Sequence, residues 1–220
     1  VYGLDQLPPI SYSPSANVFM RLRARASESG QLSTGVTIGD PEYQTSSDAM
    51  ASDDQPPVRE SFEYALARLP GTRLECRQVF NSLSSVCRIP PPLLGRAANE
   101  NSVRMQIPGR NVIHIAAHGL VDHQYDNLFG ALALSTARGT TDDDGFLRYH
   151  EIVALDLREC QLAVLSACQT NLAPNRPLEA GASLAQAFIA AGANRVVASH
   201  WSVPDDSTAE LMSKFFRKLS

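Results

Sequence analysis

Two residues of the chain carry the side chains needed for nucleophilic catalysis and stand at comparable places in the sequence. His118 follows the apolar run 111–117, and Cys168 follows the apolar run 161–167. A thiolate is the attacking form of cysteine, and a free thiol with a pKa near 8.5 is mostly protonated at neutral pH. A neighbouring imidazole can accept that proton and later return it to a leaving amine. The pair therefore predicts a Cys-His dyad for acyl transfer.

The two runs that precede these residues are typical of buried strands. Both are short, apolar and bounded by small or polar residues, and 111–117 is predicted to end in a turn at His118-Gly119. Open α/β sheets place their ligand sites beyond the carboxyl ends of parallel strands, so we expect His118 and Cys168 at one edge of a sheet. Small flanking residues would let a peptide backbone approach closely. The backbone N–H groups of Gly119 and Cys168 are the predicted oxyanion donors.

The rest of the chain predicts an α/β domain with a mostly parallel sheet flanked by helices. A polar stretch, 40–57, is predicted to be a mobile surface loop. Strands are predicted at 35–39, 111–117, 131–134, 161–167 and 194–200, the fourth and fifth joined through a helix. Helices are predicted at 15–28, 58–70, 71–84, 99–106 and 178–191, and from a capping box at 207–210 to the end; residues 148–157 are predicted to be a short helix or a connection.

Composition excludes several classes of protein. Of the 220 residues, 44% are hydrophobic and 19% charged, as in an ordinary soluble domain. The formal charge of -4, without a basic run, disfavours nucleic-acid binding. The longest apolar stretches have about ten residues, whereas a membrane span needs roughly 20, and no signal-peptide pattern is present. We therefore expect a cytoplasmic protein.

The cysteines fit a reducing compartment. The chain has four, with no C-x-x-C pair, which is too few to staple a domain of this size. Apart from Cys168, the simplest interpretation is that each is a small buried hydrophobe, and this applies to Cys76, Cys87 and Cys160.

In a series of ordered blocks the sequence resembles the CHAT peptidases, relatives of caspases and separases. The matching blocks are 10–16, Gly39-Asp40-Pro41, 114–119, 128–135, 165–170, 179–181, 187–193 and 196–203. The histidine of this family falls on His118 and its cysteine on Cys168. His118 also precedes Cys168 by 50 residues, a separation like that in caspases.

The resemblance implies a caspase-like three-layer sandwich and a cysteine endopeptidase that acts on a protein or peptide substrate without a cofactor. It also implies regulated proteolysis, in cell-death or stress signalling, and a regulatory repeat domain or partner protein outside this chain. Members of the family often begin with a further strand and continue past the closing helix. Residues 1–220 are therefore expected to be a single domain that is truncated at both ends.

The resemblance says less about specificity. The metacaspase branch, which cleaves after Arg or Lys, carries an acid two residues before the cysteine, where this chain has Ser166, so a basic preference is not supported. Candidate pocket residues are Asp122, Ser166, Glu179, Trp201, Asp205 and Asp206. The carboxylates among them could equally be solvated or cap helices, and Trp201 could simply pack.

Two rival sites involve metals. His114 and His118 lie four residues apart, with Asp122 and His123 beyond, a spacing that would suit zinc on a helix. On a strand, however, four residues span about 13 Å, and the glutamate of H-E-x-x-H is missing. The acidic segment 142–145 could bind calcium, although a solvated loop is the simpler interpretation.

Two rivals are not metal sites. A serine esterase is disfavoured because the sequence has no G-x-S-x-G. An inactive scaffold or protein-interaction module with the same fold is the alternative from another class. The presence of both His118 and Cys168 argues against it.

Overall fold

The computed structural model describes residues 13, 15–28, 32–43, 66–120, 130–136, 143–167, 183–199 and 205–219. The chain divides into two compact units, Val1–Gly30 and Gln31–Ser220. The first contains helix α1 (Ala16–Glu28), as predicted. Ser15 caps this helix, because its hydroxyl oxygen accepts a hydrogen bond from the N–H of Val18 at 3.2 Å.

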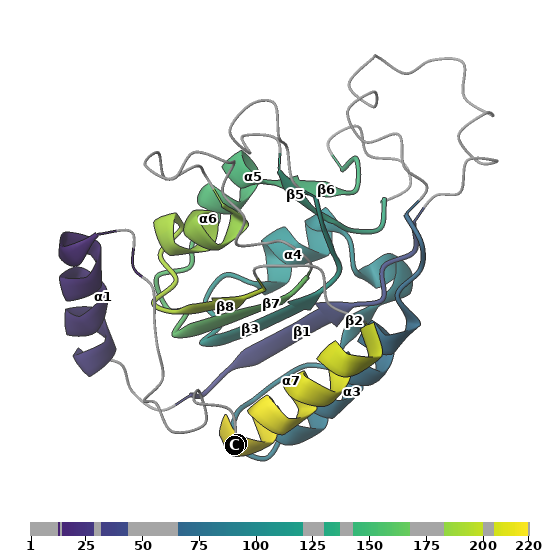
Figure 1. Cartoon of the computed structure of the whole chain (residues 1–220), viewed down its shortest axis with the longest axis horizontal. Coiled ribbons are helices and arrows are strands. Elements are labelled where there is room, and N and C mark those ends of the chain that lie inside the picture. Colours follow the sequence, from purple (N-terminus) through teal and green to yellow (C-terminus); the bar gives the residue numbers. More distant parts are fainter. Residues whose placement is uncertain are drawn as a thin grey trace, which may run out of the picture. The chain divides into compact units, whose positions relative to one another are not determined.

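The second unit is built on a five-stranded sheet with the order β2-β1-β3-β7-β8, in which all neighbouring strands run parallel (Figure 1). The strands are β1 (Gly35–Gly39), β2 (Leu93–Leu94), β3 (Val112–Ala116), β7 (Leu162–Ser166) and β8 (Val196–Ala198). The parallel sheet predicted from the apolar runs is therefore confirmed. Strand β2, which follows three consecutive prolines, was not predicted.

Helices cover both faces of this sheet, as expected of a three-layer α/β fold (Figure 1). On one side, α3 and α7 lie against each other and α3 packs on β1 and β3; α5 and α6 lie together on the other side, where α4 also lies. Their bounds are α3 (Pro70–Leu83), α4 (Glu100–Gln106), α5 (Tyr149–Val153), α6 (Leu184–Ala190) and α7 (Asp205–Leu219), with a short 3-10 helix, η3, at Gly95–Ala97.

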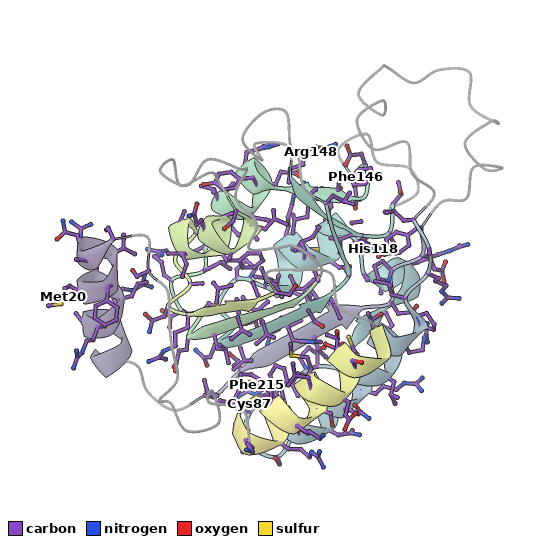
Figure 2. The ribbon with its side chains drawn as sticks, viewed as in Figure 1. Met20, Cys87, His118, Phe146, Arg148 and Phe215 are labelled. Carbon is purple, nitrogen blue, oxygen red and sulfur yellow. The ribbon has the colours of Figure 1, made fainter. Side chains whose placement is uncertain are left out.

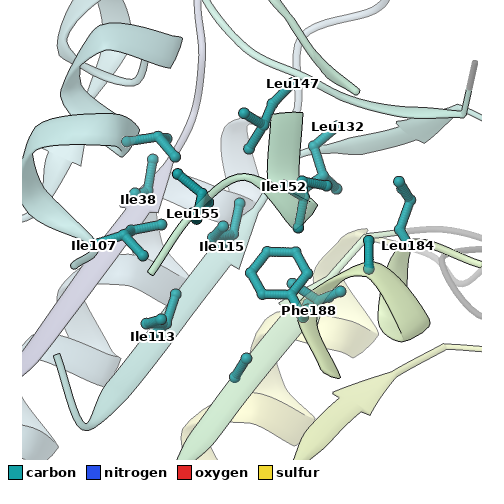
Figure 3. Packing of buried hydrophobic residues seen from close by; sticks show 14 of the residues in the cluster. Ile38, Ile107, Ile113, Ile115, Leu132, Leu147, Ile152, Leu155, Leu184 and Phe188 are labelled. Carbon is teal, nitrogen blue, oxygen red and sulfur yellow. The ribbon is translucent and has the colours of Figure 1, made fainter. Parts of the chain in front are cut away.

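Side chains of the central strands alternate between the two layers. Ile113 and Ile115 of β3 belong to the larger apolar cluster, which includes Phe188 of α6 (Figure 3). Val112 of β3 belongs to a second cluster with Phe216 of α7. Since both faces of the sheet are buried, the strands are mostly apolar on both sides, which is the pattern of a parallel sheet.

A second, three-stranded antiparallel sheet has the order β4-β5-β6. Its strands are β4 (His118–Leu120), β5 (Ala131–Ala133) and β6 (Phe146–Arg148). The hairpin strand predicted at 131–134 is confirmed, but the turn predicted at His118-Gly119 is wrong. The backbone groups of 118–120 need partners once the chain leaves the parallel sheet, and β5 supplies them.

The prediction of a helix over 58–70 is wrong for the part that the structure describes, because residues 66–69 are irregular and α3 begins at Pro70. A proline disfavours the helical conformation of the residue before it and suits the first turn of a helix. Residues 58–65, like residues 44–57 of the predicted loop, lie outside the described residues.

Two other helix starts differ from the prediction. Helix α7 begins at Asp205, so Ser207 lies within the helix and does not cap it. Helix α6 begins after Ser183, whose hydroxyl accepts the N–H of Gln186 while the Gln186 side chain accepts the N–H of Ser183. Residues 178–182 of that predicted helix lie outside the described part of the chain.

Candidate active site

Three strands of the central sheet end level with one another. Gly39 of β1 pairs with Ala116 of β3, and Ala116 pairs with Ser166 of β7. His118 lies two residues beyond Ala116, and Cys168 follows Ser166 by the same number in the sequence. The predicted base and nucleophile thus follow neighbouring strands whose ends are in register, at the carboxyl edge where such sheets bind ligands.

The half-buried ring of His118 is held by a backbone carbonyl (Figure 2). Its Nε2 lies 2.7 Å from the carbonyl oxygen of Ala67. A carbonyl oxygen only accepts hydrogen bonds, so Nε2 must carry a proton and donate it. In the neutral ring the lone pair then belongs to Nδ1. This hydrogen bond makes Nδ1 the basic nitrogen of His118.

Tyr43 makes a second contact with the same residue. The backbone N–H of His118 donates to the Tyr43 hydroxyl at 3.3 Å, and the two rings lie 5.3 Å apart at 46°. Two segments that are distant in sequence, 40–43 and 66–69, therefore both contact His118. Sequence reasoning missed Tyr43 and Ala67 because neither contact follows a local pattern.

The approach to the predicted nucleophile is anchored in the sheet. Ala167 is 4% exposed, and its carbonyl oxygen accepts a hydrogen bond from the Ser199 hydroxyl. Ser199 directly follows β8, the neighbouring strand. The residue before Cys168 is therefore tied to the end of the next strand.

Several predicted site residues are not brought together by the described structure. Ser166 is the last residue of β7 and is 7% exposed. Gly119 is the central residue of β4, opposite Leu132. Asp205 and Asp206 open α7. Cys168, Asp122, Glu179 and Trp201 lie outside the described residues, and so does His123.

A buried polar cluster lies beneath the sheet, and sequence reasoning missed it. Nε2 of His114 is 2.7 Å from Oε1 of Glu75, and Nδ1 is 2.7 Å from Oγ1 of Thr37. All three side chains have no exposed surface, and Phe216 packs edge-on against the imidazole at 5.4 Å. An ionisable residue in the middle of an apolar strand needs a buried partner, and this signal was present in the sequence.

His114 is positively charged at neutral pH. Burial alone would lower its pKa, but hydrogen bonds with Cys76 and Glu75 and the negative charge of Glu75 outweigh burial and raise the pKa to about 9. The cluster is therefore a buried ion pair between α3 and β3. It is closed to any substrate, because none of its side chains reaches the surface.

The three cysteines that the structure describes, Cys76, Cys87 and Cys160, are not in disulfides. Cys160 is buried, as predicted, and burial raises the pKa of the half-buried Cys87 thiol. Cys76 is also buried, but it contacts more than apolar atoms, since its Sγ lies 4.0 Å from Nδ1 of His114. Cys76 and Cys160 lack the exposure, and Cys87 lacks the lowered pKa, that mark a reactive thiol.

Several residues of the two metal hypotheses that the structure describes have other partners. Both ring nitrogens of His114 already have partners in Thr37 and Glu75. Asp143 accepts the N–H of Asn101, and Asp144 forms an ion pair with Arg148. Within the described ranges, no group of three His, Cys, Asp or Glu side chains is arranged to hold a metal ion.

The sequence profile of the CHAT domain matches residues 6–220, nearly the whole chain. The chain therefore belongs to the CHAT domain family, a family of caspase-like domains. The parallel sheet flanked by helices agrees with that fold. No curated protein matches the chain. Of the helices that the structure describes, none combines the length and apolar character needed to cross a membrane.

Proposed function

We propose that this chain is a cysteine endopeptidase in which Cys168 is the nucleophile and His118 the general base. One observation carries the proposal. The Ala67 carbonyl holds Nε2–H of His118, so Nδ1 is the nitrogen that can accept a proton, at the edge where β3 and β7 end in register. Membership of a caspase-like family supports the same assignment.

The reaction proceeds through a thioester. Nδ1 of His118 takes the thiol proton of Cys168, and the thiolate attacks the carbonyl carbon of the peptide bond. The N–H groups of Gly119 and Cys168 stabilise the oxyanion that forms. His118 returns the proton to the leaving amine, and the carbon–nitrogen bond breaks. Water, deprotonated by His118, then hydrolyses the thioester and restores the thiol.

The Ala67 carbonyl takes the orienting role that a carboxylate has in many triads. When Nδ1 is protonated, Nε2–H still donates to Ala67, so the same contact holds the ring in both states. A neutral carbonyl fixes the tautomer without adding a negative charge beside the imidazole. The residues of the chain thus need no cofactor for this chemistry.

We propose that the substrate pocket is formed by Asp122, Ser166, Glu179, Trp201 and Asp205. The hydroxyl of Ser166 at the end of β7 is uncharged, which gives a lysine or arginine side chain no attraction there. The substrate is a protein, and cleavage is regulated by a repeat domain or partner protein outside this chain. Cell-death or stress signalling in the cytoplasm is the proposed setting.

The test is cleavage of a positional-scanning peptide library by the wild-type chain and three variants. Cys168→Ala and His118→Ala should each reduce kcat/KM by at least about 1,000-fold while retaining the fold. The two residues act as a unit, so removing either one removes most of the rate enhancement. Cys160→Ala is the matched control, since Cys160 is buried and outside the site. It should leave the rate unchanged.

Two results would contradict the proposal. If Cys160→Ala alone abolishes activity, the nucleophile is Cys160 and not Cys168. If a thiol-directed peptide inhibitor labels Cys168 no faster than a free thiol, and labelling does not depend on His118, then the chain is an inactive caspase-fold scaffold or interaction module.

A further inference from the structure

Asp40 directly follows β1 at the same edge of the sheet as His118, and its backbone is in an unusual conformation. Its φ is +46°, the only positive value at a non-glycine residue among the described residues. Aspartate adopts this left-handed region more readily than most residues, although still at some cost. The side chain is 1% exposed. A strained, buried carboxylate requires surroundings that hold it in place.

The carboxylate of Asp40 binds two arginines of residues 66–73, the segment that comprises the irregular stretch before α3 and the first turn of that helix. Arg73 Nε donates to Oδ2 at 2.5 Å, and Arg68 Nη2 donates to the same oxygen at 3.2 Å. Both arginines reach solvent, with side chains 39% and 58% exposed, whereas the carboxylate is buried. Charge-assisted hydrogen bonds of this kind are stronger and more directional than neutral ones.

The backbone of Asp40 binds the same segment between the two arginines. The N–H of Asp40 donates to the Thr72 hydroxyl at 2.9 Å, and that hydroxyl donates to the carbonyl of Leu69 at 2.6 Å. On the other side, the carbonyl of Asp40 accepts the N–H of Gly95 at 3.0 Å. Asp40 is therefore fixed to its neighbours and contacts residues 68, 72 and 73 directly.

This segment contains the carbonyl that orients His118. Residues 66–69 are irregular, and Ala67 is exposed, so its own methyl group gives little packing to fix its position. Residues 68–73, which follow Ala67 directly, carry the contacts to Asp40. The position of the Ala67 carbonyl therefore depends on the contacts that Asp40 makes.

From these contacts we infer that Asp40 is a positioning residue for His118. It holds the start of α3 and the irregular turn before it, so that the Ala67 carbonyl faces Nε2 of His118 and leaves Nδ1 as the base. The importance of Asp40 for catalysis rests on the proposed peptidase function. The effect of Asp40 on the tautomer of His118 is independent of that function.

Two substitutions separate the charge of Asp40 from its backbone conformation. Asp40→Asn keeps the shape and the tolerance of positive φ but removes the charge that holds both guanidinium groups. Asp40→Gly keeps the backbone conformation and removes the side chain altogether. The matched control is Asp156→Asn, because Asp156 also pairs with an arginine, Arg158, but on an exposed surface.

The experiment uses the whole chain and measures two quantities for each variant. Nitrogen-15 NMR, at a pH where the His118 ring is neutral, reports the ratio of its Nε2–H and Nδ1–H tautomers. Steady-state kinetics on the best library peptide gives kcat and KM separately. Wild type and Asp156→Asn should show the Nε2–H tautomer and equal rates. Both Asp40 variants should show mixed tautomers, and kcat should fall by about 10- to 100-fold with KM changed less than about twofold.

The outcome overturns the inference if folded Asp40 variants keep the wild-type tautomer ratio. If they fail to fold, Arg73→Gln takes their place, and an unchanged ratio in that variant overturns the inference in the same way. A changed ratio in a chain that cleaves no peptide would support the positioning role and reject the peptidase proposal. Cleavage that requires Cys168 and His118, with an unchanged tautomer ratio in the Asp40 variants, would support the peptidase proposal and reject the positioning role of Asp40.

Discussion

His114 and His118 lie four residues apart in one segment, yet their surroundings have little in common. His114 has no exposed surface and binds Glu75 and Thr37 through its two ring nitrogens. His118 is half-buried, beyond the end of β3, and donates from Nε2 to a backbone carbonyl. A carboxylate partner keeps the first ring charged. A carbonyl partner fixes the tautomer of the second and leaves a lone pair.

The comparison teaches how a fold assigns different roles to the same side chain. His114 has a raised pKa of about 9, so its imidazole stays protonated and forms a buried ion pair with Glu75 that joins α3 to β3. At His118, the neutral partner Ala67 makes one nitrogen a donor and the other a base. The first arrangement forms a buried ion pair and the second is the one that we propose for catalysis, and each can be broken separately.

The largest expected effect on stability comes from His114→Ala. Removing one partner of a buried ion pair leaves the other charge uncompensated, so the free energy of unfolding should fall by about 3–5 kcal/mol. Urea denaturation followed by circular dichroism measures this change. His118→Ala should change the same quantity by less than about 0.5 kcal/mol, since surface or half-exposed sites contribute little.

A double variant sharpens this prediction. Glu75→Met combined with His114→Leu replaces the pair with apolar side chains of similar size, which should recover most of the lost stability because no buried charge remains. If the double variant is no more stable than His114→Ala, then removing the unpaired charge of Glu75 restores nothing, and that charge is not the cause of the loss.

The next effect is a dependence of stability on pH. The pKa of His114 rises from 6.5 in the unfolded chain to about 9 in the folded one, so the folded state binds the proton more tightly. This contribution is therefore fully present below pH 6.5 and is lost as the pH rises through about 9. It amounts to about 3 kcal/mol, at roughly 1.4 kcal/mol per pKa unit.

The contribution of His114 can be isolated by measuring the free energy of unfolding of the wild type and of the Glu75→Met/His114→Leu variant between pH 6 and 10. The free energy of unfolding of the wild type minus that of the variant should fall by about 3 kcal/mol as the pH rises through 9, since other groups titrate alike in both proteins. A value that stays constant, or rises with pH, would show that His114 is neutral in the folded chain.

Sequence reasoning found the strands of the central sheet because their signal is local. The runs that became β1, β3 and β7 are mostly apolar and buried along their whole length, which is the pattern of a strand covered on both faces. The level ends of β3 and β7 followed from the same reasoning. The position of His118 beyond the end of β3 could thus be predicted without coordinates.

The contacts that orient His118 could not be predicted, because they join segments far apart in sequence. Ala67 is 51 residues from His118, and Tyr43 is 75 residues away. The irregular turn at 66–69 was taken for helix, although Pro70 marked the true start of α3. Every residue has a backbone carbonyl, so the residue type at position 67 does not indicate that its carbonyl binds His118.

The smallest of the predicted stability effects concerns Gly39, which lies between the two regions. A Cβ at this position would lie 2.5 Å from Sγ of Cys76 and 3.1 Å from the carbonyl oxygen of Ala116. Gly39→Ala should therefore lower the free energy of unfolding by about 1–3 kcal/mol through overpacking. Thermal or urea unfolding measures the loss.

Cys76→Ala provides the control for Gly39→Ala. The double variant should lose less stability than the sum of the two single variants, because the sulfur that clashes has been removed. If the losses in the free energy of unfolding are strictly additive, the contact between residue 39 and Cys76 is not the cause of the destabilisation by Gly39→Ala.

The central claim, that His118 takes the proton of Cys168, is tested most directly by the rate at which iodoacetamide alkylates Cys168. Peptide mass spectrometry measures that rate between pH 5.5 and 9 in wild type and His118→Ala. At pH 6.5 we expect labelling to be at least about tenfold slower in His118→Ala, since a thiol without a base is mostly protonated there. Equal rates in the two proteins across the whole range would contradict the claim.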